Sequence, residues 1–319
     1  MKTSTKLFCL TAGAGAGLLF AGNFFYNIAV KPGGFAKIWD SKIPFIKPPA
    51  DMVDESYKEA VKVFSNNKGW FNEISEIRST HSEDGLLLKG YYISQSSDIY
   101  VIVCHGYMAS GREMSAFARH YYDFGYNVLL PDARGHGLSD GDYIGMGWHE
   151  RKDIIKWIYT IISENPNAKI FLHGLSMGAA TVMMTVGEEL PEAVKFAIED
   201  CGYACVWDEF AAQMNDMFHL PAFPLIHIAE RITKHRAGYT FREASALEQI
   251  KKCNIPMLFI HGDEDTFVPF KFFDQLYSAA KCEKDKLIVH GAIHAMALGT
   301  DPKAYWSKVD EFICKHLNA

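Results

Sequence analysis

The residue pattern with the clearest chemical meaning is Gly174-Leu175-Ser176-Met177-Gly178, a serine between two glycines. A predicted strand at residues 169–173 precedes it, and an apolar helical pattern at residues 177–189 follows it. Between a strand and a helix, such a serine occupies a strained turn, and the glycines lack the bulk that would keep strand and helix apart. The turn projects the hydroxyl above the sheet, and the positive end of the helix lies beneath it. The pattern therefore predicts Ser176 as a nucleophile.

A serine hydroxyl is a weak nucleophile until a neighbouring base accepts its proton. In proteins with this strand–serine–helix turn, the acid and then the histidine follow the serine along the chain. Acidic side chains follow a predicted strand end in residues 261–269, sequence HGDEDTFVP, and His290 and His294 follow the last apolar run. Asp200, which ends another predicted strand, is a further position for the acid. The order of the residues leaves these choices open.

These motifs resemble those of α/β-hydrolases of the serine aminopeptidase-like and esterase branch. In that branch the acid lies in an H-G-x-x-D-x-x-V-P segment and the base in a G-x-x-H segment, which match residues 261–269 and 291–294. The resemblance therefore implies Asp265 rather than Asp263 as the acid, and His294 rather than His290 as the base. It covers the chain from about residue 73 to the C-terminus.

Two further segments carry the same resemblance, His105-Gly106-Tyr107 and residues 132–139 with the sequence DARGHGLS. In the family, the first segment supplies one backbone amide of an oxyanion hole, which corresponds here to Tyr107. The residue after the nucleophile, Met177, supplies the other. The segment around Arg134 is a structural loop in such proteins.

The elements that must position these residues alternate along the chain. Apolar runs predict strands, Asp84-Gly85 predicts a hairpin turn between the first two, and helical patterns separate the later ones. This alternation predicts an α/β-hydrolase fold, in which a mostly parallel eight-stranded sheet carries helices on both faces. The predicted strands cover residues 74–80, 86–94, 99–104, 126–130, 169–172, 194–198, 257–260 and 287–289, and the predicted helices cover residues 113–124, 148–163, 177–189, 271–280 and 302–316.

The segment from residue 202 to residue 245 is longer than a strand-to-strand crossover needs. It is rich in aromatic and methionine side chains, so we expect a small helical lid inserted into a catalytic domain that spans residues 73–319. Trp207, Phe210 and Met214 could line an acyl pocket, although packing within the lid explains them equally well.

The first thirty residues carry Lys2 and Lys6 followed by an uncharged stretch at residues 7–30, which is long enough for a membrane helix. We expect an uncleaved single-pass anchor at residues 1–30, with a cleaved signal peptide as the main alternative. Lysines flank the stretch on both sides, so orientation is weakly determined, and an extracytoplasmic catalytic domain is our expectation. The proline- and glycine-rich residues 31–72 predict a linker with a helical edge segment.

The composition excludes several other functions. A net charge of -6 disfavours nucleic-acid binding, because phosphate recognition needs a basic surface. The seven cysteines have no repeated spacing, and His219, His227 and His235 form no H-E-x-x-H motif, so no metal site is expected. No organic cofactor is expected either.

The sequence thus predicts a serine hydrolase that transfers the acyl group of a small-molecule substrate through an acyl-enzyme intermediate. The resemblance implies a carboxylesterase or lipase-like activity on apolar acyl groups. A serine peptidase acting on short peptides is the alternative within enzymes. A catalytically silent, membrane-tethered binding protein is the alternative from another class. The oligomeric state stays open.

Overall fold

The computed structural model describes residues 17–34, residue 62 and residues 67–317, so most of the linker predicted at residues 31–72 lies outside the described residues. The centre of the molecule is one eight-stranded sheet with the strand order β1-β2-β4-β3-β5-β6-β7-β8. Its strands are β1 (Glu76–His81), β2 (Leu87–Ile93), β3 (Ile99–Cys104), β4 (Asn127–Pro131), β5 (Lys169–Leu175), β6 (Val194–Asp200), β7 (Met257–Gly262) and β8 (Lys284–Val289).

Strand pairing is antiparallel at one edge of the sheet and parallel elsewhere. Strand β1 pairs with β2, and β2 with β4, in the antiparallel sense, and the hairpin turn between β1 and β2 contains Gly85 at a φ of 87°. From β4 onward the pairs β4–β3, β3–β5, β5–β6, β6–β7 and β7–β8 are all parallel. The predicted mostly parallel sheet is confirmed. Parallel pairing places the carboxyl ends of these strands along one edge, where ligands bind in such sheets.

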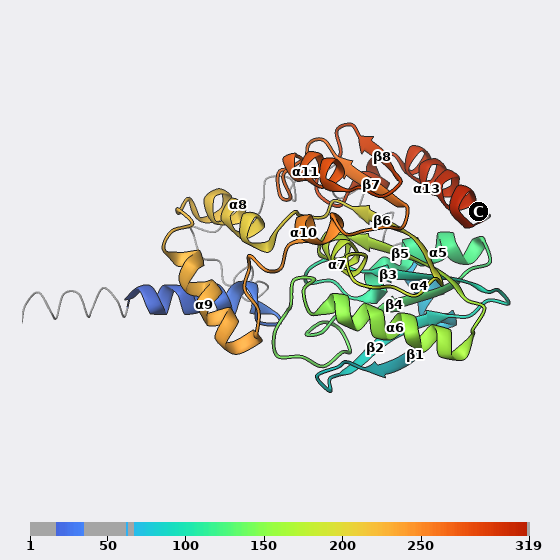
Figure 1. The fold of residues 1–319 in the computed structure, drawn as a ribbon, viewed down its shortest axis with the longest axis horizontal. Coiled ribbons are helices and arrows are strands. Elements are labelled where there is room, and N and C mark those ends of the chain that lie inside the picture. The colour runs from blue at the N-terminus through green and yellow to red at the C-terminus, as the bar shows by residue number, and fades with distance from the viewer. Residues whose placement is uncertain (1–16, 35–61, 63–66, 318–319) are drawn as a thin grey trace, which may run out of the picture.

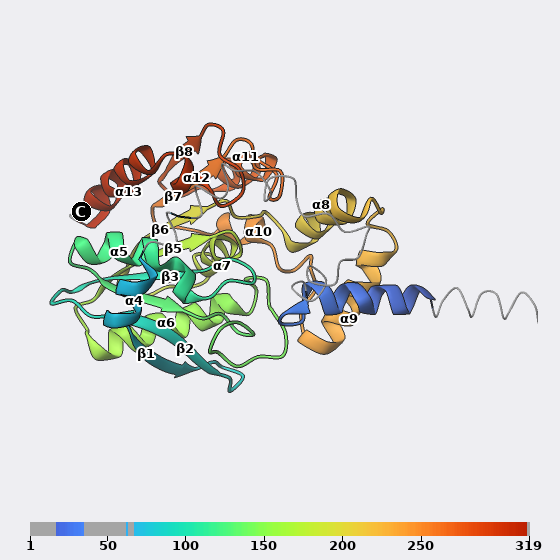
Figure 2. The same cartoon turned by 180° about the vertical axis from the view of Figure 1, so that it is seen from behind.

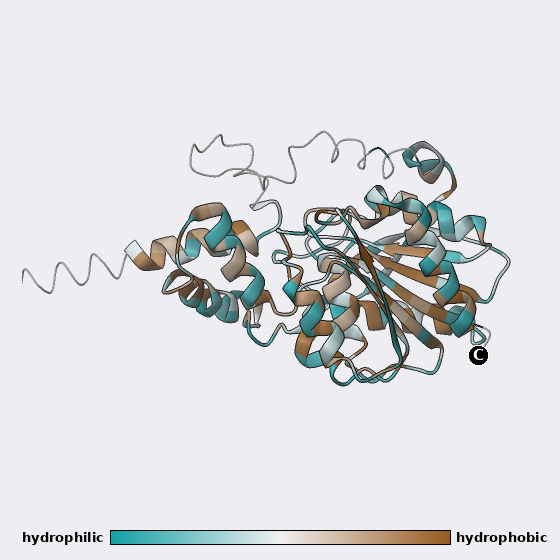
Figure 3. Ribbon diagram, turned by 90° about the horizontal axis from the view of Figure 1, so that it is seen from above, coloured by the Kyte–Doolittle hydropathy of each residue, from teal (hydrophilic) through white to brown (hydrophobic). Residues whose placement is uncertain are grey.

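Helices cover both faces of the sheet (Figures 1 and 2). One face packs on α6 (Glu150–Glu164), α7 (Met177–Thr185), α10 (Ala246–Ile250) and α11 (Lys271–Ala279), and the other on α4 (Lys68–Ile74), α5 (Ser115–Asp123), α12 (Ala297–Thr300) and α13 (Pro302–Leu317). Neighbouring residues of β3 alternate between the two cores, Ile102 toward the first and Val103 toward the second. A strand buried on both sides must be apolar throughout, which explains the uninterrupted apolar runs in the sequence and the hydrophobic strands in Figure 3.

A separate group of helices lies beyond the carboxyl edge of the sheet (Figure 1). The 202–245 segment contains α8 (Val206–Phe218) and α9 (Leu225–Ala237), and an antiparallel bridge between Cys205 and Ser245 joins its two ends. A third helix, at residues 17–29, packs against this segment. Gly22 permits the contact, because a Cβ atom there would collide with the Ile228 side chain of α9.

The expectation of a single-pass membrane anchor at the N-terminus is wrong. Within residues 17–34, 62 and 67–317, no helix combines the length and the hydropathy that a membrane span requires. In the second half of this segment, Tyr26, Ile28 and Val30 are buried in the protein core, whereas Leu19 and Phe20 in its first half are exposed. The expected membrane localisation, with an extracytoplasmic catalytic domain, depended on this anchor and is wrong for the same reason.

Candidate active site

Ser176 occupies a strained turn between β5 and α7. Its φ of 56° and ψ of -116° lie in a region that side chains with a Cβ atom rarely adopt. The two flanking glycines permit the turn, since a Cβ atom on Gly174 would collide with the Gly178 carbonyl and one on Gly178 with the Cys104 carbonyl. The Ser176 amide donates a 2.8 Å hydrogen bond to the Asp200 carbonyl, which fixes the turn to the end of β6.

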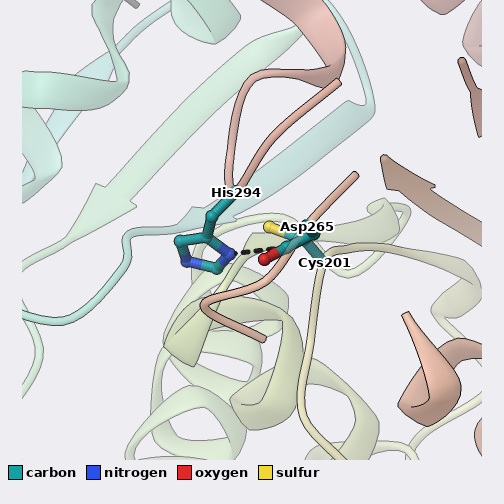
Figure 4. A group of neighbouring side chains, drawn as sticks. All are labelled: Cys201, Asp265 and His294. Carbon is teal, nitrogen blue, oxygen red and sulfur yellow. Dashed lines mark hydrogen bonds and ion pairs between the residues drawn. The ribbon is translucent and has the colours of Figure 1, made fainter. Parts of the chain in front are cut away.

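His294 links Ser176 to Asp265. The Ser176 hydroxyl lies 2.9 Å from His294 Nε2. His294 Nδ1 in turn lies 2.8 Å from Asp265 Oδ2 (Figure 4). His294 follows β8 and Asp265 follows β7, so both side chains reach the carboxyl edge of the sheet from neighbouring loops. In this geometry the serine can donate its proton to Nε2 while Nδ1–H donates to the carboxylate.

Asp265 is held as a carboxylate although it is buried. Burial raises its pKa, but the charge interaction with His294 and hydrogen bonds from His261 and His294 outweigh burial and lower the pKa to about 2. The Val268 amide also donates to Asp265 Oδ1 at 2.8 Å. His261 Nε2 lies 3.3 Å from Oδ2 and donates to the Val268 carbonyl at 3.0 Å. An ionised and fixed acid can stabilise a positive imidazole beside it.

The side chains of the alternative residues have partners other than Ser176. The side chain of His290 is 88% exposed and pairs with Asp263 at 2.6 Å. Asp200 is buried, and its carboxylate accepts a 2.9 Å hydrogen bond from the Tyr305 hydroxyl of α13. Of the candidate acids and bases, the structure brings Asp265 and His294 together with Ser176.

The loop after β3 lies against Ser176, because a Cβ atom on Gly106 would be 3.5 Å from the serine side chain. Two buried histidines fix this loop: the Ala133 amide donates to His105 Nε2 at 3.0 Å, and the Met108 amide donates to His136 Nε2 at 3.3 Å. Burial lowers the pKa of each imidazole to about 4, so both are neutral acceptors at neutral pH. Tyr107 therefore lies in a fixed loop beside Ser176.

Met177 is the first residue of α7, so its amide has no hydrogen-bond acceptor within its own helix. Arg134, from the segment predicted to be structural, is buried and pairs with Asp153 at 2.7 Å and with Asp84 at 2.9 Å. These two ion pairs hold the loop after β4 against α6 and the β1–β2 hairpin.

An apolar cavity opens beside Ser176 and contains about 820 Å3 of empty space, including the solvent at its mouth. Phe210 and Met214 line it, while Trp207 instead lies against Arg242 and His227. The lining residues are Phe25, Ile28, Ala29, Tyr107, Met146, Ser176, Met177, Tyr203, Glu209, Phe210, Gln213, Met214, Met217, Phe218, Ile226, Ala229, Phe241, Phe267 and Val268.

Two parts of this cavity escaped sequence reasoning. Phe25, Ile28 and Ala29 come from the stretch predicted to be an anchor, where an apolar pattern fits a membrane span as well as a pocket wall. Glu209 of α8 was also missed, since an isolated acid in a helix gives no signal. It is buried, its Oε1 accepts a 3.1 Å hydrogen bond from Gln213, and its Oε2 has no partner. Burial raises the pKa of Glu209 well above its usual value, which favours the protonated form of the side chain.

Cys201 is the third side chain beside Asp265 and His294, and the ligand atoms of the three lie within 4.8 Å of one another (Figure 4). A cysteine binds metals as the thiolate. Burial and the neighbouring Asp200 and Asp265 carboxylates raise the pKa of Cys201 well above its usual value. His294 and Asp265 are already hydrogen-bonded to each other. This donor set therefore does not fit a metal ion.

The sheet order, the strand–Ser176–helix turn and the histidine and acid on the loops after β8 and β7 define the α/β-hydrolase class of fold. A family model described as serine aminopeptidase, S33, matches residues 95–215. The uncharacterized protein YqkD of Bacillus subtilis is 32% identical over 280 residues, which cover 86% of this chain and 91% of YqkD.

Solved structures agree with this class. An esterase from Pyrococcus furiosus superposes with a TM-score of 0.63 at 25% identity, over 76% of this chain and 91% of the esterase. An acylaminoacyl peptidase from Pyrococcus horikoshii gives a TM-score of 0.58 at 19% identity, over 79% of this chain and 43% of the peptidase, and this likeness concerns the fold alone. The chain therefore belongs to the α/β-hydrolase superfamily, as a hydrolase of the family that includes YqkD.

Proposed function

We propose that the protein is a serine carboxylesterase in which Ser176 is the nucleophile, His294 the general base and Asp265 the acid that orients it. The observation that carries this proposal is the hydrogen-bonded chain of 2.9 Å from Ser176 Oγ to His294 Nε2 and 2.8 Å from His294 Nδ1 to Asp265 Oδ2. Ser176 lies at the wall of an apolar cavity, so an acyl group bound there has its carbonyl within reach of the hydroxyl.

In the first step, Ser176 Oγ attacks the ester carbonyl carbon and its proton passes to His294 Nε2. The backbone amides of Tyr107 and Met177 are the proposed donors to the oxyanion, and one such donor contributes about 3 kcal/mol to transition-state stabilisation. The intermediate collapses, the C–O bond to the alcohol breaks, and the alcohol takes the proton from His294. Water then attacks the acyl-enzyme by the same steps in reverse and releases the carboxylic acid.

The lining of the cavity favours an ester with an apolar acyl group over a peptide. Most of the lining side chains are aromatic, methionine or aliphatic, and Glu209 and Gln213 are hydrogen-bonded to each other. Peptide backbone buried against such walls would leave its amide and carbonyl groups without partners, which costs free energy. An alkyl chain has no such groups, so its burial is favourable.

The test is labelling with a fluorophosphonate, which reacts with an activated serine. We expect the wild-type chain and Ser163→Ala, which removes an exposed hydroxyl, to label equally, and Ser176→Ala to remain unlabelled. Wild-type protein should then hydrolyse p-nitrophenyl esters. A folded wild-type chain that does not label overturns the proposal and favours a binding protein. Labelling combined with cleavage of aminoacyl amides but not of esters would instead identify a peptidase.

A further inference from the structure

The 17–34 segment forms part of the cavity wall, although at least 142 positions separate it from Ser176 in the sequence (176 minus 34). Phe25, Ile28 and Ala29 line the cavity from one side of the 17–29 helix. Figure 1 shows this helix, in blue, beside α9 and at the carboxyl end of the sheet. A segment in this position can affect which substrates fit without touching the reacting atoms.

Hydrogen bonds fix the inner end of this segment to the loop beside Ser176. The Tyr107 hydroxyl lies 3.1 Å from the carbonyl of Ile28 and 3.1 Å from that of Ala29. The Ile144 amide donates to the Val30 carbonyl at 2.7 Å. Buried carbonyls rarely lack a donor, so these bonds stabilise the docked position. Ile28 and Ala29 are therefore held close to the loop that carries the proposed oxyanion amide.

The outer part of the helix is fixed to α9. Arg236 donates to Asn23 Oδ1 at 2.8 Å, and its guanidinium lies 5.0 Å from the ring centroid of Tyr26. Because these contacts hold the helix from a second side, its residues keep a defined distance from Ser176. The helix is thus a fixed wall of the cavity.

Phe25 lies about one helical turn before Ile28 and Ala29, which is about 5 Å farther along the helix axis. Its ring packs edge-on against Phe218 of α8, with ring centroids 5.3 Å apart and an interplanar angle of 88°. Both rings line the cavity. Phe25 therefore lies farther along the helix from the Tyr107 attachment than Ile28 and Ala29 do.

We propose that the 17–34 segment sets the length of the acyl chain that the enzyme accepts, and that the Phe25 ring, packed on Phe218, forms the end of the acyl pocket. This inference rests on the proposed esterase function. The enzyme then hydrolyses esters of short and medium acyl chains, whose ends reach Phe25, and discriminates against chains that would have to displace the ring. Phe25 determines specificity and does not take part in the chemical steps.

The experiment compares full-length wild type with Phe25→Ala, Phe25→Trp and the control Phe24→Ala. Phe24 is the neighbouring residue, is 38% exposed and is not among the lining residues. The measured quantity is kcat/KM for p-nitrophenyl esters from acetate to palmitate. One methylene in an apolar pocket changes this constant about tenfold or more, so we expect Phe25→Ala to raise the palmitate-to-butyrate ratio by at least about tenfold. Phe25→Trp should lower the ratio, and Phe24→Ala should leave it unchanged.

Two further measurements separate this inference from the proposed function. Fluorophosphonate labelling at saturating probe should be complete in all four proteins, because none of the substitutions changes Ser176, His294 or Asp265. Binding of octanoate, laurate and palmitate by calorimetry reports pocket length without catalysis, and Phe25→Ala should favour the longer acids. An unchanged ratio and unchanged fatty-acid preference in both Phe25 variants would overturn the inference. If wild type fails to label, the esterase proposal falls, and the fatty-acid series alone decides whether Phe25 ends the pocket.

Discussion

The carboxyl edge of the sheet and the helical wall of the cavity are built by different means. At the edge, Ser176, Asp265 and His294 each lie in a short local motif at the end of a strand, and hydrogen bonds of 2.9 and 2.8 Å join them. The wall combines the 17–29 helix with α8 and α9, and apolar packing dominates it. The edge depends on the geometry of a few hydrogen-bonded side chains, whereas the wall depends on the packing of many apolar ones. In the proposed enzyme, chemistry and substrate choice are therefore carried by separate parts of the chain.

The largest expected effect is a loss of catalytic activity that leaves ligand binding in the cavity unchanged. Asp265→Asn removes the charge that stabilises a positive imidazole and favours the wrong tautomer of His294, so we expect kcat to fall about 10^4-fold. Fatty-acid binding should stay within about twofold of wild type. The matched control is Asp263→Asn, which changes the acid paired with the exposed His290 and should leave kcat unchanged. Equal losses in both variants would mean that Asp265 has no special role.

Gly178→Ala tests how little the edge tolerates. The added Cβ atom would collide with the Cys104 carbonyl at the end of β3, so the free energy of unfolding should fall by about 3 kcal/mol. Gly69→Ala in α4 is the control, because nothing lies within 4 Å of its added atom and alanine favours helix by about 0.5 kcal/mol or more. Urea unfolding measures both variants. A Gly178→Ala protein as stable as wild type would contradict the close approach of strand and helix.

Glu209→Gln tests whether the acid buried in the cavity wall makes the stability of the protein depend on pH. The folded-state pKa of Glu209 is raised by burial, so its contribution to stability is complete below the unfolded pKa of about 4.5 and is lost as pH rises toward the folded value. Glutamine does not titrate. Relative to wild type, the variant should gain stability as the pH rises above about 4.5, by up to about 1.4 kcal/mol per pH unit. Thermal unfolding across this range measures the gain, with the exposed Glu248→Gln as control. A constant difference would show that Glu209 is ionised in the folded protein.

Tyr107→Phe tests the junction of the two regions and carries the smallest expected effect. The backbone amide remains, but the hydrogen bonds to the Ile28 and Ala29 carbonyls are lost, at a cost of about 1 kcal/mol. Hydrogen exchange should quicken in residues 17–34. The control is Tyr203→Phe, which removes a bond of 2.9 Å to the Met146 carbonyl and should leave exchange in that segment unchanged. Equal exchange in both variants would place the attachment of the segment elsewhere.

Sequence analysis succeeded where structure depends on neighbouring residues. The expected strand at residues 99–104 coincides with β3, and the strand–serine–helix turn lies between β5 and α7 as predicted. Strand ends were less accurate: β5 and β6 continue to Leu175 and Asp200 because parallel pairing with their neighbours extends them beyond the apolar runs. The existence and type of these elements could be predicted because they depend on local apolar patterns and turn residues.

The N-terminal helix shows where such reasoning fails. An apolar stretch minimises exposure equally well in a membrane and against other helices, and the difference depends on residues as distant as Tyr107 and Arg236. Gly22 marks a close contact with α9, but in the sequence it resembles any glycine of a membrane helix. Tertiary contacts decide whether such a stretch spans a membrane or packs on the protein, and a hydropathy pattern contains no information about these contacts.

Tyr107 attaches the first helix through the carbonyls of Ile28 and Ala29, which are backbone atoms that every residue type supplies. The side chains at positions 25, 28 and 29 can therefore be exchanged while the attachment is kept. For protein engineering, this means that substitutions at three positions of the helix should change the acyl-chain preference of the pocket, while Ser176, Asp265 and His294 stay unchanged. A library of variants with different acyl-chain preferences could therefore share the rest of the chain and differ only in the helix at residues 17–29.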